Sequence, residues 1–161
     1  MVKRMRAMRG LLIGLALLAS GCASAVPEQA PTPAVASQGA AAQAATPSLN
    51  AYRAANGLSG LSRSAALQRA AESHARDMER MGDMTHTGSD GSSVGDRVKQ
   101  QGYRFRRVAE NIAETGRGAD RVMELWIASA PHRKNMLLPD VTQYGLAQSG
   151  DYWALVVGRP R

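Results

Sequence analysis

Residues 143–158 read QYGLAQSGDYWALVVG, and this stretch decides the sheet of the fold. Its second half, residues 152–157, is the most strand-like run in the chain because aromatic and β-branched side chains favour strands. A turn sequence, Ser149-Gly150-Asp151, separates it from the residues before. The stretch therefore predicts a β-hairpin with strands at 143–148 and 152–158.

Helical patterns precede this hairpin. One apolar face recurs at alternating spacings of four and three residues and predicts a helix over 62–81; its members are Leu67, Ala71, His74, Met78 and Met81. We expect shorter helices at 48–57, at 94–101 and from a cap at Asp120 to a stop at Pro131. One further turn is expected at 132–138 and a third strand at 106–108. Helices packed on a small antiparallel sheet make an α+β fold.

Few side chains in this chain can carry chemistry. His74 lies on the apolar face of the long helix, and we interpret it as a core histidine satisfied by a hydrogen bond. His86 lies in the polar, glycine-containing loop 85–93, and His132 follows Pro131. Glu110 stands inside an apolar run, where a carboxylate is costly unless it is paired. Position alone leaves His86, Glu110 and His132 open to a structural or a functional role.

Five segments in order resemble the CAP superfamily, the SCP-like proteins that include cysteine-rich secretory proteins, antigen 5 and plant pathogenesis-related proteins. They are 49–53 with 67–78, 86–91, Arg97 with 102–103, 110–113, and Trp126 with 129–136. Gly145 and the strand at 152–158 complete the match to the bacterial branch. The resemblance covers residues 48–161 and implies a three-layer α-β-α sandwich with a cleft lined by two His and two Glu.

The resemblance carries over to this chain residue by residue. His86 matches the first His of the cleft, Glu110 the first Glu and His132 the second His. The second Glu belongs to a Trp-x-x-Glu element, and Ser129 stands in its place here. The tetrad is thus incomplete. We expect a binding module whose cleft holds a small ligand, a lipid, a metal ion or another envelope component.

The same side chains leave other chemistries open. His86, Glu110 and His132 could form a three-ligand zinc set with an open position. Alternatively, Ser129 as nucleophile with His132 as base and Glu110 as orienter would make an envelope peptidase or esterase. No H-E-x-x-H or G-x-S-x-G motif supports an enzyme, so we assign no catalytic residue. A third alternative is a purely structural domain.

The first residues predict export. A basic stretch with Lys3 and three arginines, an apolar run at 11–18 and small residues at 19–21 make a cleavable secretory signal. Cys22 follows directly, and the stretch resembles a bacterial lipobox. The resemblance implies cleavage after residue 21 and acylation of Cys22 with palmitate-type chains. Ala23 then resembles a signal for the outer membrane, if the host has two membranes.

The domain organisation follows from these features. Residues 1–21 form the signal, 22–47 the lipidated cysteine with an Ala/Pro-rich linker that we expect to be disordered, and 48–161 the folded domain. Cys22 is the only cysteine, so the domain has no disulfide and no thiolate metal ligand. The formal charge of +7 falls to about +3 without the signal. Since its arginines are scattered along the sequence, we expect no binding to nucleic acid. We also expect a monomeric envelope domain.

Overall fold

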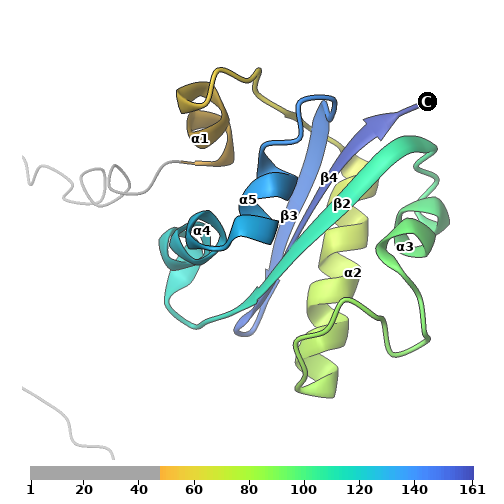
Figure 1. The fold of residues 1–161 in the computed structure, drawn as a ribbon. Helices are drawn as coiled ribbons and strands as arrows, with labels where there is room; N and C mark the ends of the chain where they lie inside the picture. Colours follow the sequence, from red (N-terminus) through yellow and green to blue (C-terminus); the bar gives the residue numbers. More distant parts are fainter. Residues whose placement is uncertain (1–47) are drawn as a thin grey trace, which may run out of the picture. The chain divides into compact units, whose positions relative to one another are not determined.

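The computed structural model describes residues 48–161, and these form a sheet with helices on both faces (Figure 1). In chain order the elements are α1 (Leu49–Ala55), β1 (Ser62–Arg63), α2 (Ala65–Met81), α3 (Val94–Gln100), β2 (Phe105–Glu114), α4 (Gly118–Ala128), α5 (Ala130–Met136), β3 (Gln143–Ser149) and β4 (Tyr152–Pro160). This mixed arrangement confirms the predicted α+β class. The signal, Cys22 and the linker lie outside the described residues.

The sheet has the strand order β1-β3-β4-β2. The predicted hairpin is confirmed: β3 and β4 pair antiparallel, with Ser149 opposite Tyr152 across the turn. β4 also pairs antiparallel with β2, which places Glu110 opposite Val156 at the middle of the strand. β1 adds a short parallel edge to β3.

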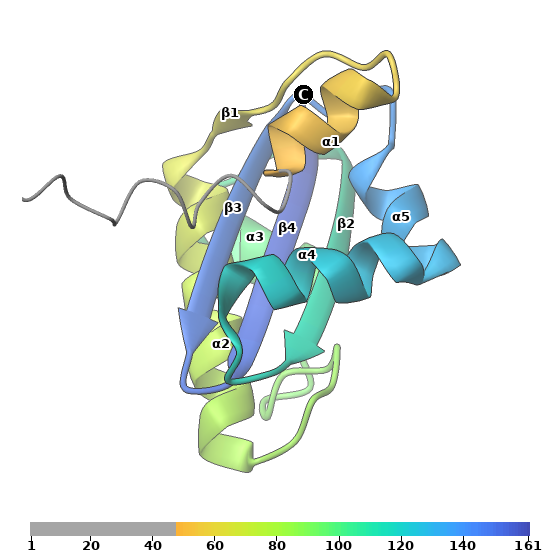
Figure 2. The ribbon, with the colours of Figure 1, turned by 90° about the vertical axis from the view of Figure 1, so that its left-hand side faces the viewer.

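Three layers result from the period of two along β4. Trp153, Leu155 and Val157 face one core, which is completed by side chains of α1, α4 and α5. The intervening Ala154 and Val156 face a second core, formed with α2 and α3. Figure 2 shows α1, α4 and α5 in front of the sheet and α2 behind it. The predicted α-β-α sandwich is confirmed.

The long helix lies unusually close to the sheet. A Cβ at Gly145 would stand 2.3 Å from the backbone carbonyl carbon of Leu67, closer than any side chain can approach. Only a glycine in β3 therefore lets α2 pack backbone to backbone at this point. This close packing buries the face of α2 that carries His74.

Several predicted boundaries are wrong for identifiable reasons. The helix expected at 62–81 begins only at Ala65. The backbone N–H of Ser62 donates to the Thr142 carbonyl oxygen and that of Ser64 to the Tyr144 carbonyl oxygen, so this segment pairs with β3 instead. Ser64 then caps the helix. The strand expected at 106–108 is much longer, since β2 runs through Glu110 to Glu114.

Two further expectations concern α4 and α5. Asp120 is not a cap. It lies in the first turn of α4, where its negative charge interacts favourably with the positive end of the helix dipole. Pro131 does not merely stop α4, because it lies in the first turn of α5. Proline is accepted there since the first N–H groups of a helix have no internal partner. Among residues 48–161, no helix is long and apolar enough to cross a bilayer.

Candidate functional site

The loop between α2 and α3 is fastened at several points and carries His86. Asp77 of α2 accepts hydrogen bonds from the Ser89 backbone N–H at 2.7 Å and from its hydroxyl at 2.8 Å. Arg97 of α3 donates to the carbonyl oxygens of Ser92 at 2.7 Å and His86 at 3.1 Å. The loop that presents His86 is thereby held by both neighbouring helices.

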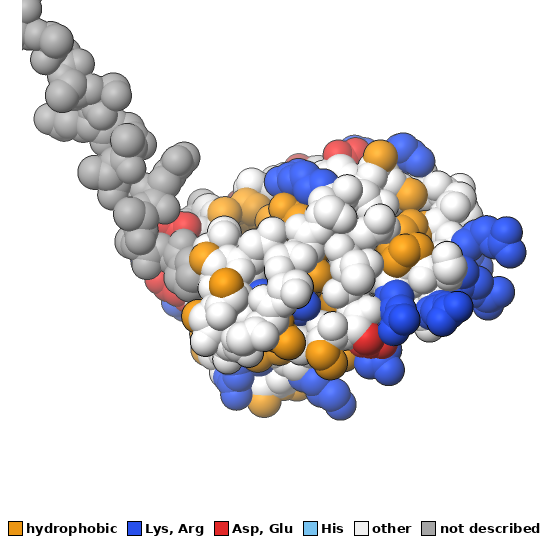
Figure 3. All heavy atoms as spheres, turned by 90° about the horizontal axis from the view of Figure 1, so that it is seen from above, with side chains coloured by type: hydrophobic (Ala, Val, Ile, Leu, Met, Phe, Trp, Pro, Cys, Tyr) orange, Lys and Arg blue, Asp and Glu red, His pale blue; other side chains and the backbone are white. Residues whose placement is uncertain are grey.

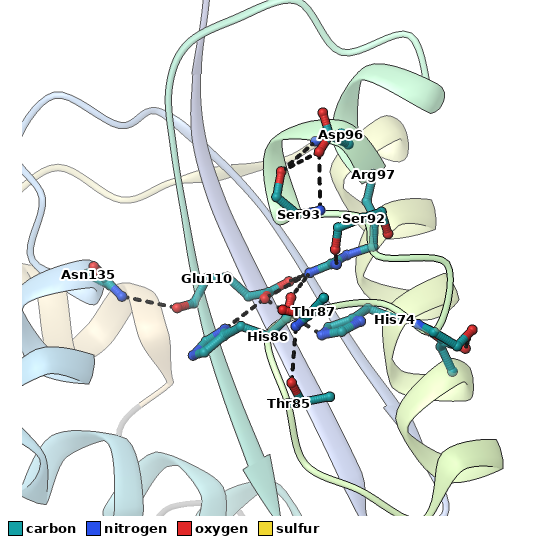
Figure 4. A network of polar contacts seen from close by, with 12 residues as sticks. His74, Thr85, His86, Thr87, Ser92, Ser93, Asp96, Arg97, Glu110 and Asn135 are labelled. Carbon is teal, nitrogen blue, oxygen red and sulfur yellow. Dashed lines mark hydrogen bonds and ion pairs between the residues drawn. The ribbon is translucent and has the colours of Figure 1, made fainter.

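Glu110 is the centre of the site. Its side chain is 2% exposed and comes from the middle of β2. Nη2 of Arg97 lies 3.0 Å from Oε1 and 2.8 Å from Oε2. Nδ1 of His86 lies 2.9 Å from Oε1, and Nε2 of His74 lies 3.7 Å from the same atom (Figure 4). One carboxylate from the sheet thus joins the loop, α2 and α3.

This geometry determines how His86 is oriented. A carboxylate paired with arginine is ionised and can only accept hydrogen bonds, so Nδ1 of His86 must donate to Glu110. In the neutral ring, Nε2 then carries a free lone pair. Nδ1 points at the buried carboxylate and the His86 side chain is 58% exposed, so the lone pair of Nε2, on the other side of the ring, is available to a ligand.

His74 lies where the sequence predicted, in the core, but its expected hydrogen bond is absent. It is fully buried, and within the described part of the chain neither ring nitrogen has a hydrogen-bond partner. Burial lowers its pKa; the charge on Glu110 opposes this effect and the charge on Arg97 adds to it. The His74 ring is therefore neutral. It packs against the Glu110 carboxylate but does not balance its negative charge.

Two asparagines, Asn135 of α5 and Asn111 of β2, connect α5 to the site. Asn135 donates to the backbone oxygen of Glu110 at 3.0 Å and to Oδ1 of Asn111 at 2.9 Å. Asn111 in turn donates to the carbonyl oxygen of His132 at 3.1 Å. Burial lowers the pKa of His132, and the nearby His86 lowers it further. His132 therefore lies close enough to His86 for its pKa to be affected by that ring.

Among the described residues, the Ser129 side chain is not hydrogen-bonded to the other residues of the site. Its backbone precedes α5, and within residues 48–161 its hydroxyl makes no hydrogen bond to His132. The carboxylate of Glu110 bonds to His86 and Arg97 instead of His132. The arrangement considered for a serine hydrolase, with Ser129, His132 and Glu110 in a chain of hydrogen bonds, is not formed.

The side chains also do not fit the zinc set considered above. Within the part of the chain that the structure describes, no group of three His, Cys, Asp or Glu side chains is placed to hold a metal ion. Both oxygens of Glu110 already face Arg97, and Nδ1 of His86 is bound to the same carboxylate. We therefore derive no chemistry through zinc.

One hollow shares Arg97 with this network. It has a volume of about 530 Å³ and is bordered by Arg97, while His86, Glu110 and His132 do not line it; its residues are Ser73, Arg76, Asp77, Arg80, Ser89, Asp90, Ser92, Arg97 and Gln100. This hollow is therefore not the expected cleft, because none of the three matched residues lines it. The exposed edge of His86 is instead the accessible part of the site.

Sequence reasoning missed the role of Arg97. The sequence analysis named Arg97 only as part of a family motif. In the structure its residue is 5% exposed, and it supplies the positive charge that pairs with Glu110. A usable signal was present: Glu110 in an apolar run requires a buried cationic partner. The sequence could not say which arginine, because the pairing joins α3 to β2.

The three-layer α-β-α fold and the histidines gathered at the buried Glu110 agree with the resemblance to the SCP-like proteins. The chain belongs to the cysteine-rich secretory protein (CAP) family, whose profile matches residues 48–155. A Bacillus subtilis relative, uncharacterized protein YkwD, is 31% identical over 106 residues. The match covers 65% of this chain and 41% of that relative, so this chain spans less than half of its length.

Solved structures share the fold. An extracellular protein containing a SCP domain from Bacillus anthracis matches with a TM-score of 0.63 and 26% identity over 69% of this chain and 37% of its own. An outer surface protein from Borrelia burgdorferi matches with a TM-score of 0.64 and 19% identity, which shows the fold alone. The match covers 70% of this chain and 87% of the Borrelia chain, so that protein consists almost entirely of this fold.

The pairing of Arg97 with Glu110 predicts strongly non-additive effects on stability. Arg97→Met or Glu110→Leu alone should lower the free energy of unfolding by about 3–5 kcal/mol, because each leaves a buried charge without its partner. The double variant should lose much less than the sum. Urea denaturation measures all three. The exposed pair Arg121 and Glu124, 3.0 Å apart, is the control and should show little change; additive losses at Arg97 and Glu110 would contradict the pairing.

The buried His74 predicts a pH-dependent stability. Since its pKa is lowered in the folded state, the unfolded chain takes up a proton below about pH 6.5 that the folded chain resists. Stability contributed by the neutral ring is thus complete above that pH and is lost as the pH falls. In His74→Gln the slope of unfolding free energy between pH 7 and 5 should be shallower, by at most about 1.4 kcal/mol per pH unit. Parallel slopes for the two proteins would refute this role.

Proposed function

We propose that this chain is an exported, lipid-anchored CAP-domain protein of the cell envelope that binds a ligand through His86. Residues 1–21 act as the signal, Cys22 carries the lipid, 23–47 form the tether and 48–161 the binding domain. Two solved relatives, one an extracellular protein and the other an outer surface protein, support export. If the host has two membranes, Ala23 favours anchoring in the outer one.

The observation that carries the binding role is the outward lone pair of His86. Its ring is held by Glu110 at 2.9 Å, and Glu110 is held by Arg97, so the imidazole has a defined orientation although it is 58% exposed. An oriented acceptor loses little freedom when a ligand binds. The ligand group must therefore donate a hydrogen bond, as a hydroxyl, an amide or an ammonium group does.

Envelope polymers supply such donors. Sugar hydroxyls, acetamido N–H groups and peptide N–H groups all match an outward acceptor. His132, whose pKa is lowered by burial and by His86, supports the same reading because a neutral ring adds a second polar contact without adding charge. No catalytic step is assigned, since Ser129 is not hydrogen-bonded into the network.

Binding is testable with two soluble probes, an N-acetylglucosamine trimer and trialanine. We expect at least one probe to shift the backbone amide NMR signals of residues 85–93 in the domain. His86→Ala should weaken that binding about five- to tenfold, the worth of one hydrogen bond. Thr87→Ala, an exposed neighbour on the same loop, should leave affinity unchanged. Failure of both probes at millimolar concentration, or equal binding by His86→Ala, would rule the proposal out.

The anchor is testable independently of the ligand. In a bacterial host, mass spectrometry of the mature protein should find an N-terminal Cys22 carrying a diacylglyceryl group, and the protein should sediment with membranes. Cys22→Ala should abolish acylation, while Ser20→Ala should not. An unacylated soluble product that begins at another residue would exclude the anchor.

A further inference from the structure

Arginines gather at one end of the sheet. Six basic residues lie at the start of β2, at the end of β4 and on α3; they are Lys99, Arg104, Arg106, Arg107, Arg159 and Arg161. Phe105 pairs with Pro160, and the Arg161 N–H donates to the Arg104 carbonyl oxygen at 3.0 Å, so the two chain segments are in contact. Figure 3 shows Lys and Arg side chains gathered on the side where Figure 1 places α3 and the end of β4.

The charges of this arginine-rich end are poorly neutralised. Arg107 and Arg159 stand directly opposite each other on β2 and β4, an arrangement that destabilises a sheet. Asp140 pairs with Arg107 at 3.1 Å, and Asp96 lies 3.8 Å from Lys99. Within residues 48–161, the side chains of Arg104, Arg106 and Arg159 make no hydrogen bond or ion pair. The fold thus tolerates a concentration of positive charge that it does not use internally.

A groove with an apolar floor is bordered by three of these cations. It has a volume of about 620 Å³, and its lining includes Tyr103 and Phe105 together with Lys99, Arg104 and Arg161, but no acidic residue. Nζ of Lys99 lies 5.9 Å from the centre of the Phe105 ring. Cations above aromatic rings suit a ligand with a negative head and an apolar body.

We propose that this arginine-rich end docks on anionic phospholipid headgroups of a membrane. Guanidinium groups bind phosphate through paired N–H donors, and several exposed arginines add their attraction to a negatively charged leaflet. The apolar floor favours a lipid over a fully soluble anion. The inference rests here on the proposed function, in which export and the lipid on Cys22 bring the domain to such a surface. This docking is separate from the lipid on Cys22, because it uses only residues of the folded domain.

Residues 48–161 without lipid are suitable for the test. Both cores are formed within this range, and the Borrelia protein consists almost entirely of the same fold, so the domain can stand alone. Binding is measured by co-sedimentation with vesicles of phosphatidylglycerol and phosphatidylcholine, compared with vesicles of phosphatidylcholine alone. We expect binding only to the anionic vesicles, and weaker binding at high salt.

Matched variants locate the surface. Arg104→Gln, Arg106→Gln and Arg159→Gln together remove no internal bond and should weaken vesicle binding about 100-fold, at roughly fivefold per arginine. The control combines Arg76→Gln, Arg117→Gln and Lys134→Gln, three exposed positions with the same loss of charge. We expect it to weaken binding less than about fivefold.

Three results would overturn the proposal. They are equal binding to neutral and anionic vesicles, no binding to anionic vesicles, and equal loss in both triple variants, which would reduce the effect to net charge. A competition arm with soluble polyphosphate separates sources of phosphate. If polyphosphate binds the domain but anionic vesicles do not, the surface recognises a soluble polyanion and lipid docking is refuted.

Discussion

The buried ion pair between Arg97 and Glu110 is the interaction on which the rest of this site depends. Moving a carboxylate into a protein interior costs several kcal/mol, and only well-placed donors repay it. Here one guanidinium meets both carboxylate oxygens and also holds two carbonyl oxygens of the loop 85–93. The same contacts that neutralise Glu110 therefore fasten the loop, so electrostatics and loop conformation cannot be separated.

This constraint shapes what the site can do. A carboxylate committed to Arg97 is a poor metal ligand and a poor orienter for His132, but it is a good acceptor for Nδ1 of His86. The outcome is an exposed imidazole with a fixed tautomer above a buried neutral one. Such an arrangement agrees with the proposed recognition of a donor group better than with nucleophilic chemistry.

The structure also separates two kinds of polar surface in one small domain. The histidine site consists of oriented, internally bonded side chains, whereas the arginine-rich end consists of exposed charges with few partners. The first gains specificity from rigidity, and the second gains strength from the number of its charges. The proposed membrane docking and the proposed ligand binding therefore rest on different physical effects and on different sets of side chains.

Much of the fold could be predicted from local pattern. The hairpin, the helical face of residues 67–81 and the ends of α1 and α3 follow from periodicity and turn chemistry, which act over a few residues. Errors arose where distant segments meet: Ser62 joins a strand because β3 lies beside it, and β2 continues through Glu110 because β4 pairs along its whole length. Strand pairing over such separations leaves no local signature.

The sequence by itself determined the α+β class, the family resemblance, the absence of disulfides in the domain and the candidates His86, Glu110 and His132. Only the tertiary structure decided that Arg97 is the partner of Glu110, that His74 lies beneath it without a hydrogen bond, and that Ser129 stays outside the network. The physical reason is that a charged residue in an apolar stretch of sequence indicates only that the charge needs a partner. Which partner it has depends on how helices and strands far apart in the chain are packed.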